Sequence, residues 1–134
     1  MIVADANLLA YYMLDGEFTQ QAEAVRKADP RWIAPRIVRL EFLQILGKYM
    51  ARGALTRDEA VRFYRRARAS LKEYSSEADH LSVLALMEQH KCSAYDAECV
   101  LLAQSRNIQL VTGDKALQKA FPETAVSIEG FLKS

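Results

Sequence analysis

The chain has 134 residues, 51% of them hydrophobic, which is enough for one domain with a substantial core and too short for two. Charged residues make up 26% of the chain and the formal net charge is only +1, so bulk charge indicates neither a nucleic-acid nor a membrane partner. The sequence has no basic leader and no apolar run near the ~20 residues of a membrane span. We expect a single domain over residues 1–134, cytoplasmic and without membrane attachment.

The N-terminal half of the sequence predicts strands that alternate with helices. Turn residues separate the apolar stretches, and the first two prolines fall where elements meet. The predicted elements are a strand at 1–4, helices at 7–14 and 18–28, a strand at 31–34, and helices at 35–53 and 56–74.

The C-terminal half continues the alternation. Its predicted elements are helices at 76–89 and 93–106, a strand at 108–112, a short helix at 115–121 and a last strand at 125–128. The helix at 93–106 begins with a capping-box pattern, in which Ser93 precedes Asp96 by three residues. Strands that alternate with helices at both ends of the chain favour an α/β fold with a parallel sheet covered by helices.

Four acidic residues are predicted to meet at one edge of that sheet. Right-handed crossovers place the carboxyl ends of all parallel strands together, and open α/β folds bind ligands at this edge. Asp5 directly follows the first strand, and Asp114 follows the strand at 108–112 by two residues. Glu41 lies on an apolar helix face near the same edge, and Asp96 begins the helix that runs antiparallel into the strand at 108–112.

Each acid also has an ordinary structural explanation. Asp5 and Asp114 could be helix N-caps, and Asp96 is the third residue of a capping box. Glu41 could form an ion pair with an arginine in the preceding turn, either Arg36 or Arg39.

A bound cation explains why four acids would gather in one place. Crowded carboxylates repel one another and raise one another's pKa values unless a cation lies among them. Ligands that are all oxygens suit Mg²⁺ or Mn²⁺ better than zinc. Two such ions about 4 Å apart activate water and stabilise the leaving oxygen of a phosphodiester without a histidine base. Asn7, Ser93 and Thr112 are close enough in sequence to orient the carboxylates, although turn and cap roles explain them equally well.

Four stretches of the sequence resemble the PIN-domain family of metal-dependent ribonucleases, in particular its small VapC-type toxins. These stretches are VADANLLAYYML with Asp5, PRIVRLEFLQIL with Glu41, SAYDAECVLLAQ with Asp96, and LVTGDKALQKAF with Asp114. All four acids are present, and the resemblance covers essentially the whole chain. The departures are mild, such as Cys99 where these sequences often have an aromatic residue.

The resemblance implies a PIN-like, three-layer α/β/α sandwich around a parallel sheet of four to five strands. It also implies a metal-dependent endoribonuclease, the toxin of a toxin-antitoxin pair, which hydrolyses RNA through Mg²⁺- or Mn²⁺-activated water held by the four carboxylates. The implied partners are an RNA substrate, a cognate antitoxin whose tail fills the cleft, and a second copy of the chain in a homodimer.

Basic residues fall into two groups. Arg36, Arg39 and Lys115 lie near the predicted edge and are candidate RNA-phosphate contacts. The second group follows two helices, where a solvated helix face is the better interpretation; its members are Arg52, Arg57, Arg62, Arg65, Arg66 and Arg68. Aromatic and aliphatic residues at 40–64 could form a groove for an antitoxin segment, but core packing explains most of them.

Several other functions remain open at the level of sequence. A receiver-type signalling domain would need adjacent acids after the first strand, and a HAD-like phosphatase would need aspartate where Asn7 stands. A catalytically silent PIN-like binding module is excluded only by an assay. The proximity of His90 and Cys92 in sequence suggests zinc binding or thiol catalysis as a further alternative, but nothing nearby completes a set of about four zinc ligands. We therefore interpret Cys92 and Cys99 as reduced, buried thiols.

Overall fold

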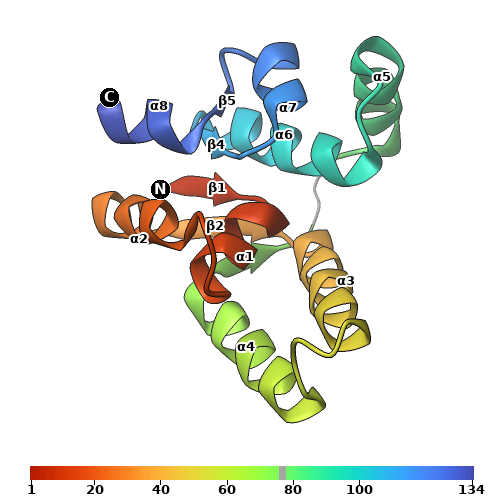
Figure 1. Cartoon of the computed structure of the whole chain (residues 1–134). Helices are drawn as coiled ribbons and strands as arrows, with labels where there is room; N and C mark the ends of the chain where they lie inside the picture. Colours follow the sequence, from red (N-terminus) through yellow and green to blue (C-terminus); the bar gives the residue numbers. More distant parts are fainter. Residues whose placement is uncertain (76–77) are drawn as a thin grey trace.

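A five-stranded sheet, parallel throughout, runs through the middle of the molecule in the order β3-β2-β1-β4-β5 (Figure 1). The structure is a computed structural model that describes residues 1–75 and 78–134. The strands are β1 (Ile2–Ala4), β2 (Trp32–Pro35), β3 (Lys72–Tyr74), β4 (Leu110–Val111) and β5 (Ala125–Val126). The predicted α/β class with a parallel sheet of four to five strands is therefore confirmed.

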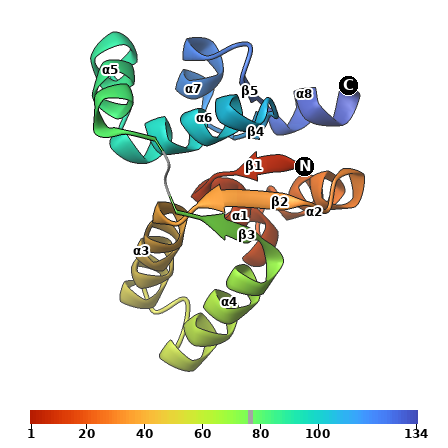
Figure 2. The same ribbon diagram turned by 180° about the vertical axis from the view of Figure 1, so that it is seen from behind.

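Helices cover both faces of this sheet. They are α1 (Ala6–Met13), α2 (Thr19–Ala28), α3 (Ile37–Ala51), α4 (Arg57–Ser70), α5 (His80–His90), α6 (Ala94–Arg106), α7 (Lys115–Ala120) and α8 (Ile128–Lys133). Figures 1 and 2 show α1, α3 and α4 on one side of the sheet and α5, α6 and α7 on the other, which confirms the three-layer arrangement. Within the described part of the chain, none of the helices combines the length and the apolar character that crossing a membrane requires.

The predicted helix at 56–74 is wrong in its last turn. Helix α4 ends at Ser70, and Lys72–Tyr74 instead forms β3, the edge strand that pairs with β2. A strand of three residues at an edge carries charged side chains and exposes one face, so it lacks the apolar run that marks a buried strand. The predicted helix was therefore extended past its true end at Ser70 into the residues of β3.

The C-terminus also departs from the prediction. The last strand ends at Val126, and Ile128–Lys133 forms an unpredicted helix, α8, whose N-cap Ser127 accepts a hydrogen bond from the Gly130 N–H at 2.8 Å. The predicted helix at 76–89 has its start outside the described residues, and α5 is seen from His80 with Asp79 as its N-cap.

The core explains why the short strands hold together. Side chains alternate across the sheet, so Val3 and Ile33 pack against one layer of helices while Ile2 and Trp32 belong to the cluster on the other face. All four side chains are at most 2% exposed. Burial of each large apolar side chain stabilises the fold by about 1.5–3 kcal/mol. The central strands are therefore held firmly in place, and so are the acidic residues that follow their carboxyl ends.

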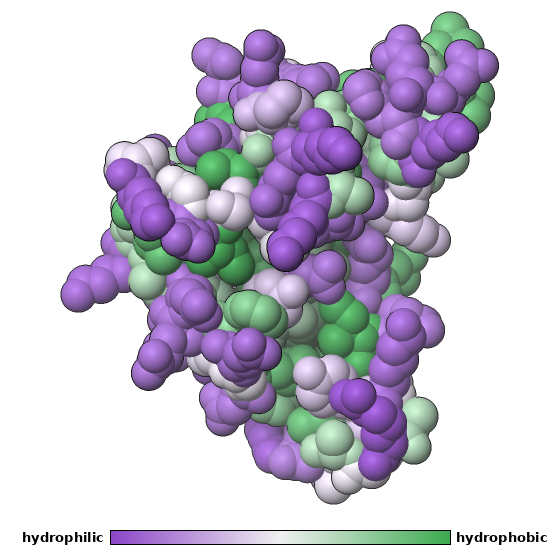
Figure 3. All heavy atoms as spheres, turned by 45° about the horizontal axis from the view of Figure 1, so that its top comes forward, coloured by the Kyte–Doolittle hydropathy of each residue, from purple (hydrophilic) through white to green (hydrophobic). Residues whose placement is uncertain are grey.

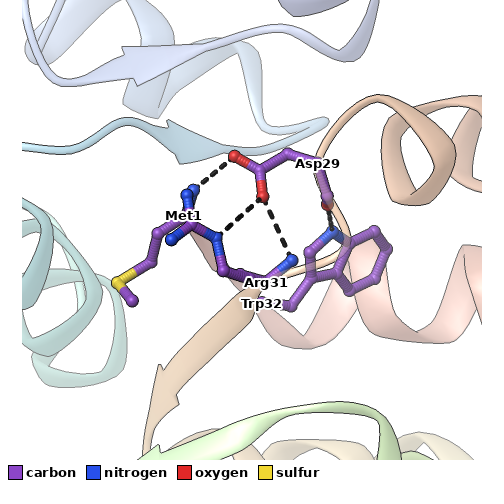
Figure 4. Close-up of polar contacts among 4 residues, drawn as sticks. All are labelled: Met1, Asp29, Arg31 and Trp32. Carbon is purple, nitrogen blue, oxygen red and sulfur yellow. Dashed lines mark hydrogen bonds and ion pairs between the residues drawn. The ribbon is translucent and has the colours of Figure 1, made fainter.

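Polar contacts hold the amino-terminal ends of β1 and β2 together (Figure 4). The Met1 ammonium forms an ion pair with the Asp29 carboxylate, which also accepts a hydrogen bond from the Arg31 backbone N–H at 3.1 Å. The Trp32 indole N–H donates to the Asp29 carbonyl oxygen at 2.9 Å. These bonds align two strands whose other ends carry the acids.

A capping box at the start of α4 gives a stability prediction. The Thr56 hydroxyl accepts a hydrogen bond from the Glu59 N–H at 3.2 Å, and the Glu59 carboxylate accepts one from the Thr56 N–H at 2.9 Å. We expect Thr56→Ala to lower the free energy of unfolding by about 1 kcal/mol and the melting temperature by about 4 °C. Thr56→Ser keeps the hydroxyl and should melt like the wild type. Equal melting of the alanine variant and the wild type would contradict the role assigned to the cap.

Candidate active site

A cavity of about 630 Å³ opens at the carboxyl end of β1, between α1, α3 and α6. Three of the four predicted acids line it: Asp5 directly after β1, Glu41 from α3, and Asp96 from the first turn of α6. The other lining residues are Ala6, Asn7, Leu40, Leu43, Gln44, Ile45, Lys48 and Tyr95. The sheet thus brings together acids that are 36 or more positions apart in the sequence. We refer to this space as the acid cavity.

Asp5 is held rigidly at the wall of the acid cavity. It is only 6% exposed and is the N-cap of α1, where its Oδ1 accepts a hydrogen bond from the Leu8 N–H at 2.9 Å. Its Oδ2 accepts a second bond from the Thr112 hydroxyl at 2.5 Å. Each carboxylate oxygen can accept more than one bond, so the cap and a ligand role are compatible.

Thr112 connects the first acid to the fourth. Its side chain is fully buried, and its Oγ1 donates to Asp5 while it accepts a hydrogen bond from the Asp114 backbone N–H at 3.0 Å. The loop after β4 is thereby tied to the end of β1, and the direction of the Asp5 carboxylate is fixed from two sides.

Asp114 does not line the acid cavity. Its Oδ1 caps α7 by accepting hydrogen bonds from the Ala116 and Leu117 N–H groups at 2.8 and 3.2 Å. Its charge still contributes to raising the pKa values of Asp5 and Asp96. The structure therefore brings three acids to the cavity and places the fourth beside them, turned to its own helix.

The acids share one electrostatic environment. Burial is the main cause that raises the pKa of Asp5 to about 6, and the charges of Asp96 and Asp114 add to it. Burial again comes first for Glu41, whose pKa rises to about 7 with help from Asp96 and Asp5. The pKa of Asp96 is raised by burial and by Asp114. Metal-free protein therefore retains protons at this site near neutral pH.

The donor set decides which metal would fit. Carboxylate oxygens without a thiolate or imidazole match Mg²⁺ or Mn²⁺. Among the described residues, no three acid, histidine or cysteine side chains lie close enough together to form a ready-made metal site. The side chains thus fit a hard divalent cation in chemistry, while coordination by three of them would require rotation of side chains such as that of Glu41, which is not hydrogen-bonded in the described structure.

The other predicted site residues divide into two groups. Asn7 lines the acid cavity, and Ser93 is the N-cap of α6, accepting a hydrogen bond from the Asp96 N–H at 3.1 Å. The basic residues predicted to contact phosphate, Arg36, Arg39 and Lys115, do not line it. Arg39 lies 4.0 Å from Glu73, so it faces β3 rather than pairing with Glu41.

Sequence reasoning missed a cation that does line the acid cavity. Lys48 is exposed and lies seven residues after Glu41 on α3, which places both on one side of the helix. That spacing was the signal that could have found it. The arginines from Arg52 to Arg68 are all exposed, as a solvated helix face requires.

The cysteine and histidine alternative has no geometric support. Cys99 is buried as predicted, whereas Cys92 is only half-buried, and both are free thiols. Burial raises the pKa of each thiol, so neither is an activated nucleophile. The His90 ring lies 4.4 Å from the Phe121 ring, in an aromatic contact.

Comparison with known proteins agrees with this fold. The PIN domain family model matches residues 2–121, so the chain belongs to the PIN domain family. The crystal structure of PAE2754 from Pyrobaculum aerophilum is similar with a TM-score of 0.79 and 20% identity, covering 98% of this chain and 86% of that one. A toxin-antitoxin complex from Klebsiella pneumoniae has a TM-score of 0.73 and 20% identity, covering 96% of this chain and 98% of that one. No curated protein matches the sequence.

The buried carboxylate gives a pH-dependent stability prediction. The pKa of Asp5 is 3.8 in the reference state and about 6 in the folded protein, so the folded state binds this proton more tightly. The contribution of this group to stability is therefore full below the lower pKa and is lost as the pH rises through the folded value. In EDTA at about pH 8, we expect Asp5→Asn to raise the free energy of unfolding by about 2 kcal/mol.

Urea unfolding of both proteins at a series of pH values measures this difference. The stability advantage of the variant should shrink towards about pH 5, where the wild-type carboxyl is largely protonated. A difference that stays constant over this range would show that ionisation of Asp5 is not its cause.

Proposed function

We propose that this chain is a metal-dependent endoribonuclease and the toxin of a toxin-antitoxin pair. PIN-domain proteins are generally nucleases, which makes hydrolysis of nucleic-acid phosphodiesters the expected class of reaction. The observation that carries the proposal is the acid cavity, where Asp5, Glu41 and Asp96 converge from distant elements at the switch point of a parallel sheet.

Each acid has a definite part in this proposal. Asp5, Glu41, Asp96 and Asp114 would hold Mg²⁺ or Mn²⁺, which when bound supplies activation of water and neutralisation of phosphate charge. Thr112 keeps the Asp5 carboxylate in place, and Ser93 fixes the start of the helix that carries Asp96. Because the acids retain protons near neutral pH, loading of the cation releases protons from them.

The proposed partners are an RNA substrate, an antitoxin protein and a second copy of the chain. The Klebsiella pneumoniae structure shows that a protein of this fold is found in a toxin-antitoxin complex. In this chain, Leu40 and Leu43 are 55% and 41% exposed on the wall of the acid cavity, which suits an apolar antitoxin segment. For the homodimer, α5 offers a surface, since it buries none of its residues and exposes Leu81 and Leu84 by 68% and 58%.

The alternatives are weaker on specific grounds. Membership of the PIN domain family removes the receiver and phosphatase alternatives. A silent binding module would have no need of three acids whose burial costs folding free energy, since their raised pKa values measure that cost. Catalysis is therefore the better explanation.

Cleavage of RNA tests the proposal. Purified protein should cut structured RNAs with Mg²⁺ or Mn²⁺ and not with EDTA, as followed by gel electrophoresis of end-labelled RNA. Asp96→Asn removes one carboxylate charge at nearly constant volume, so we expect it to lower the cleavage rate at least about 100-fold. Lys27→Gln changes an exposed residue of α2 that does not line the acid cavity, so it serves as the control and should retain the wild-type rate. Cleavage at the wild-type rate by Asp96→Asn, or by the wild type in EDTA, would contradict the proposal.

Thr112 gives a second test because its part is to position Asp5. Thr112→Val keeps the volume and burial of the side chain but removes the bonds to Asp5 and from Asp114, so we expect about a tenfold lower cleavage rate. Thr112→Ser keeps the hydroxyl and should restore most of the rate. If valine and serine variants cleave alike, the hydroxyl does not position the carboxylate. Their melting temperatures separate this effect from loss of folding.

A further inference from the structure

A second hollow, of about 220 Å³, adjoins the acid cavity and shares Asn7 and Ile45 with it. Three aromatic residues from separate parts of the chain line it: Tyr11 from α1, Phe18 at the start of α2, and Tyr49 from α3. The remaining lining residues are Ala10, Leu14, Asp15, Gly16, Glu17 and Thr19. We name this hollow the aromatic groove. Its three aromatic side chains have no role in the RNA cleavage proposed above.

The rings of the aromatic groove are exposed enough to receive a ligand. Phe18 is 41% exposed, and Tyr11 and Tyr49 are half-buried. The Tyr11 and Phe18 rings lie 4.9 Å apart and tilt by 42°, so they form one corner of the hollow. Figure 3 shows that hydrophobic residues reach the surface among hydrophilic ones in the lower half of that view.

The aromatic groove shares a wall with the acids themselves. The pKa of the Tyr11 phenol is raised by burial and then by the charges of Asp5 and Asp114, which therefore lie near its ring. A Cβ atom on Gly113 would lie only 3.1 Å from the Tyr11 hydroxyl oxygen, so the loop between Thr112 and Asp114 packs directly against this side chain. A ligand in the groove would thus lie beside a phosphate at the acids.

Charge favours a base, and not a phosphate, inside the aromatic groove. Asp15 and Glu17 line it and are both exposed, so they repel a phosphate there. Lys48 lines the acid cavity next to Tyr49, and the Arg52 guanidinium lies over the Tyr49 ring at 4.7 Å from its centroid. Lys48 lies in the last turn of α3 and Arg52 is the C-cap of this helix, so the two cations are one turn apart and can contact phosphates while the base turns inward.

We propose that the aromatic groove binds an unpaired base of the RNA strand, next to the phosphodiester that the acids cut, with Lys48 and Arg52 contacting the backbone. This inference rests on the proposed ribonuclease function. Aromatic side chains beside a basic rim are the usual platform for single-stranded nucleic acid, since every base offers a ring face for stacking. An RNA strand that crosses the acid cavity has to continue on either side of it, and the groove is continuous with the cavity through Asn7 and Ile45.

Binding of short single-stranded RNA in EDTA tests this proposal without any cleavage. The probes are fluorescein-labelled RNA strands, with a base removed at each position in turn. For the wild type, removal of one particular base should weaken binding about tenfold. Phe18→Ala should bind the intact strand about tenfold more weakly and should no longer distinguish that abasic strand. Tyr49→Leu, which keeps apolar volume without the ring, should behave in the same way.

Phe63→Ala is the matched control. Phe63 is also half-buried with an arginine over its ring, because the Arg66 guanidinium lies 6.0 Å from the ring centroid, but it lines neither the acid cavity nor the aromatic groove. This control should bind the intact RNA strand as tightly as the wild type does and should still distinguish it from the abasic strand.

Two results would overturn the proposal. If Phe18→Ala and Tyr49→Leu distinguish abasic strands as the wild type does, the groove holds no base. If these variants leave RNA affinity unchanged but weaken self-association in analytical ultracentrifugation, or abolish binding of a hydrophobic peptide, the occupant is a protein. The proposed function fails separately, since RNA that is bound through the groove but never cut with Mg²⁺ or Mn²⁺ would contradict ribonuclease activity alone.

Discussion

The buried carboxylate of Asp5 is the constraint on which the site depends. It lies at the end of the central strand, and with Thr112 it makes up the buried polar or charged residues that the described structure contains. Its burial carries a free-energy cost, seen as a pKa raised to about 6, which the bonds from Leu8 and Thr112 only partly offset. Such a cost is retained where an ionised carboxylate has a use, and the divalent cation that we propose would supply the missing stabilisation.

The topology of the sheet explains why other acids meet Asp5. Strand β1 lies between β2 and β4. The helix that follows β2 and the helix that precedes β4 lie on opposite faces of the sheet (Figure 1). Helix α3, which follows β2, presents Glu41 from one face, while α6, which leads into β4, presents Asp96 from the other. Between them lies the space that a switch point leaves open in α/β sheets. The same face of α3 continues through Lys48 to Tyr49, and this is why the acid cavity and the aromatic groove adjoin.

Much of this arrangement could be predicted from the sequence, and the exceptions have physical causes. The central strands and the acids after them were predictable, because buried apolar runs and the right-handed crossover rule fix where strand ends lie. Strand β3 was not, since its Lys72 and Glu73 carry no strand signal until β2 supplies a partner. Arg39 was assigned to the site by proximity in sequence, but its ion pair is with Glu73, a residue the prediction had placed in a helix. Side-chain direction of this kind depends on tertiary contacts that no local pattern contains.

Binding of Mn²⁺ to the protein, followed by electron paramagnetic resonance of the free ion, tests the central claim that these carboxylates form a divalent-cation site. The account predicts that wild-type protein removes Mn²⁺ from solution, that Mg²⁺ competes for the same site, and that Asp96→Asn weakens binding at least about tenfold. Equal Mn²⁺ binding by the wild type and this variant, or none by either, would contradict it.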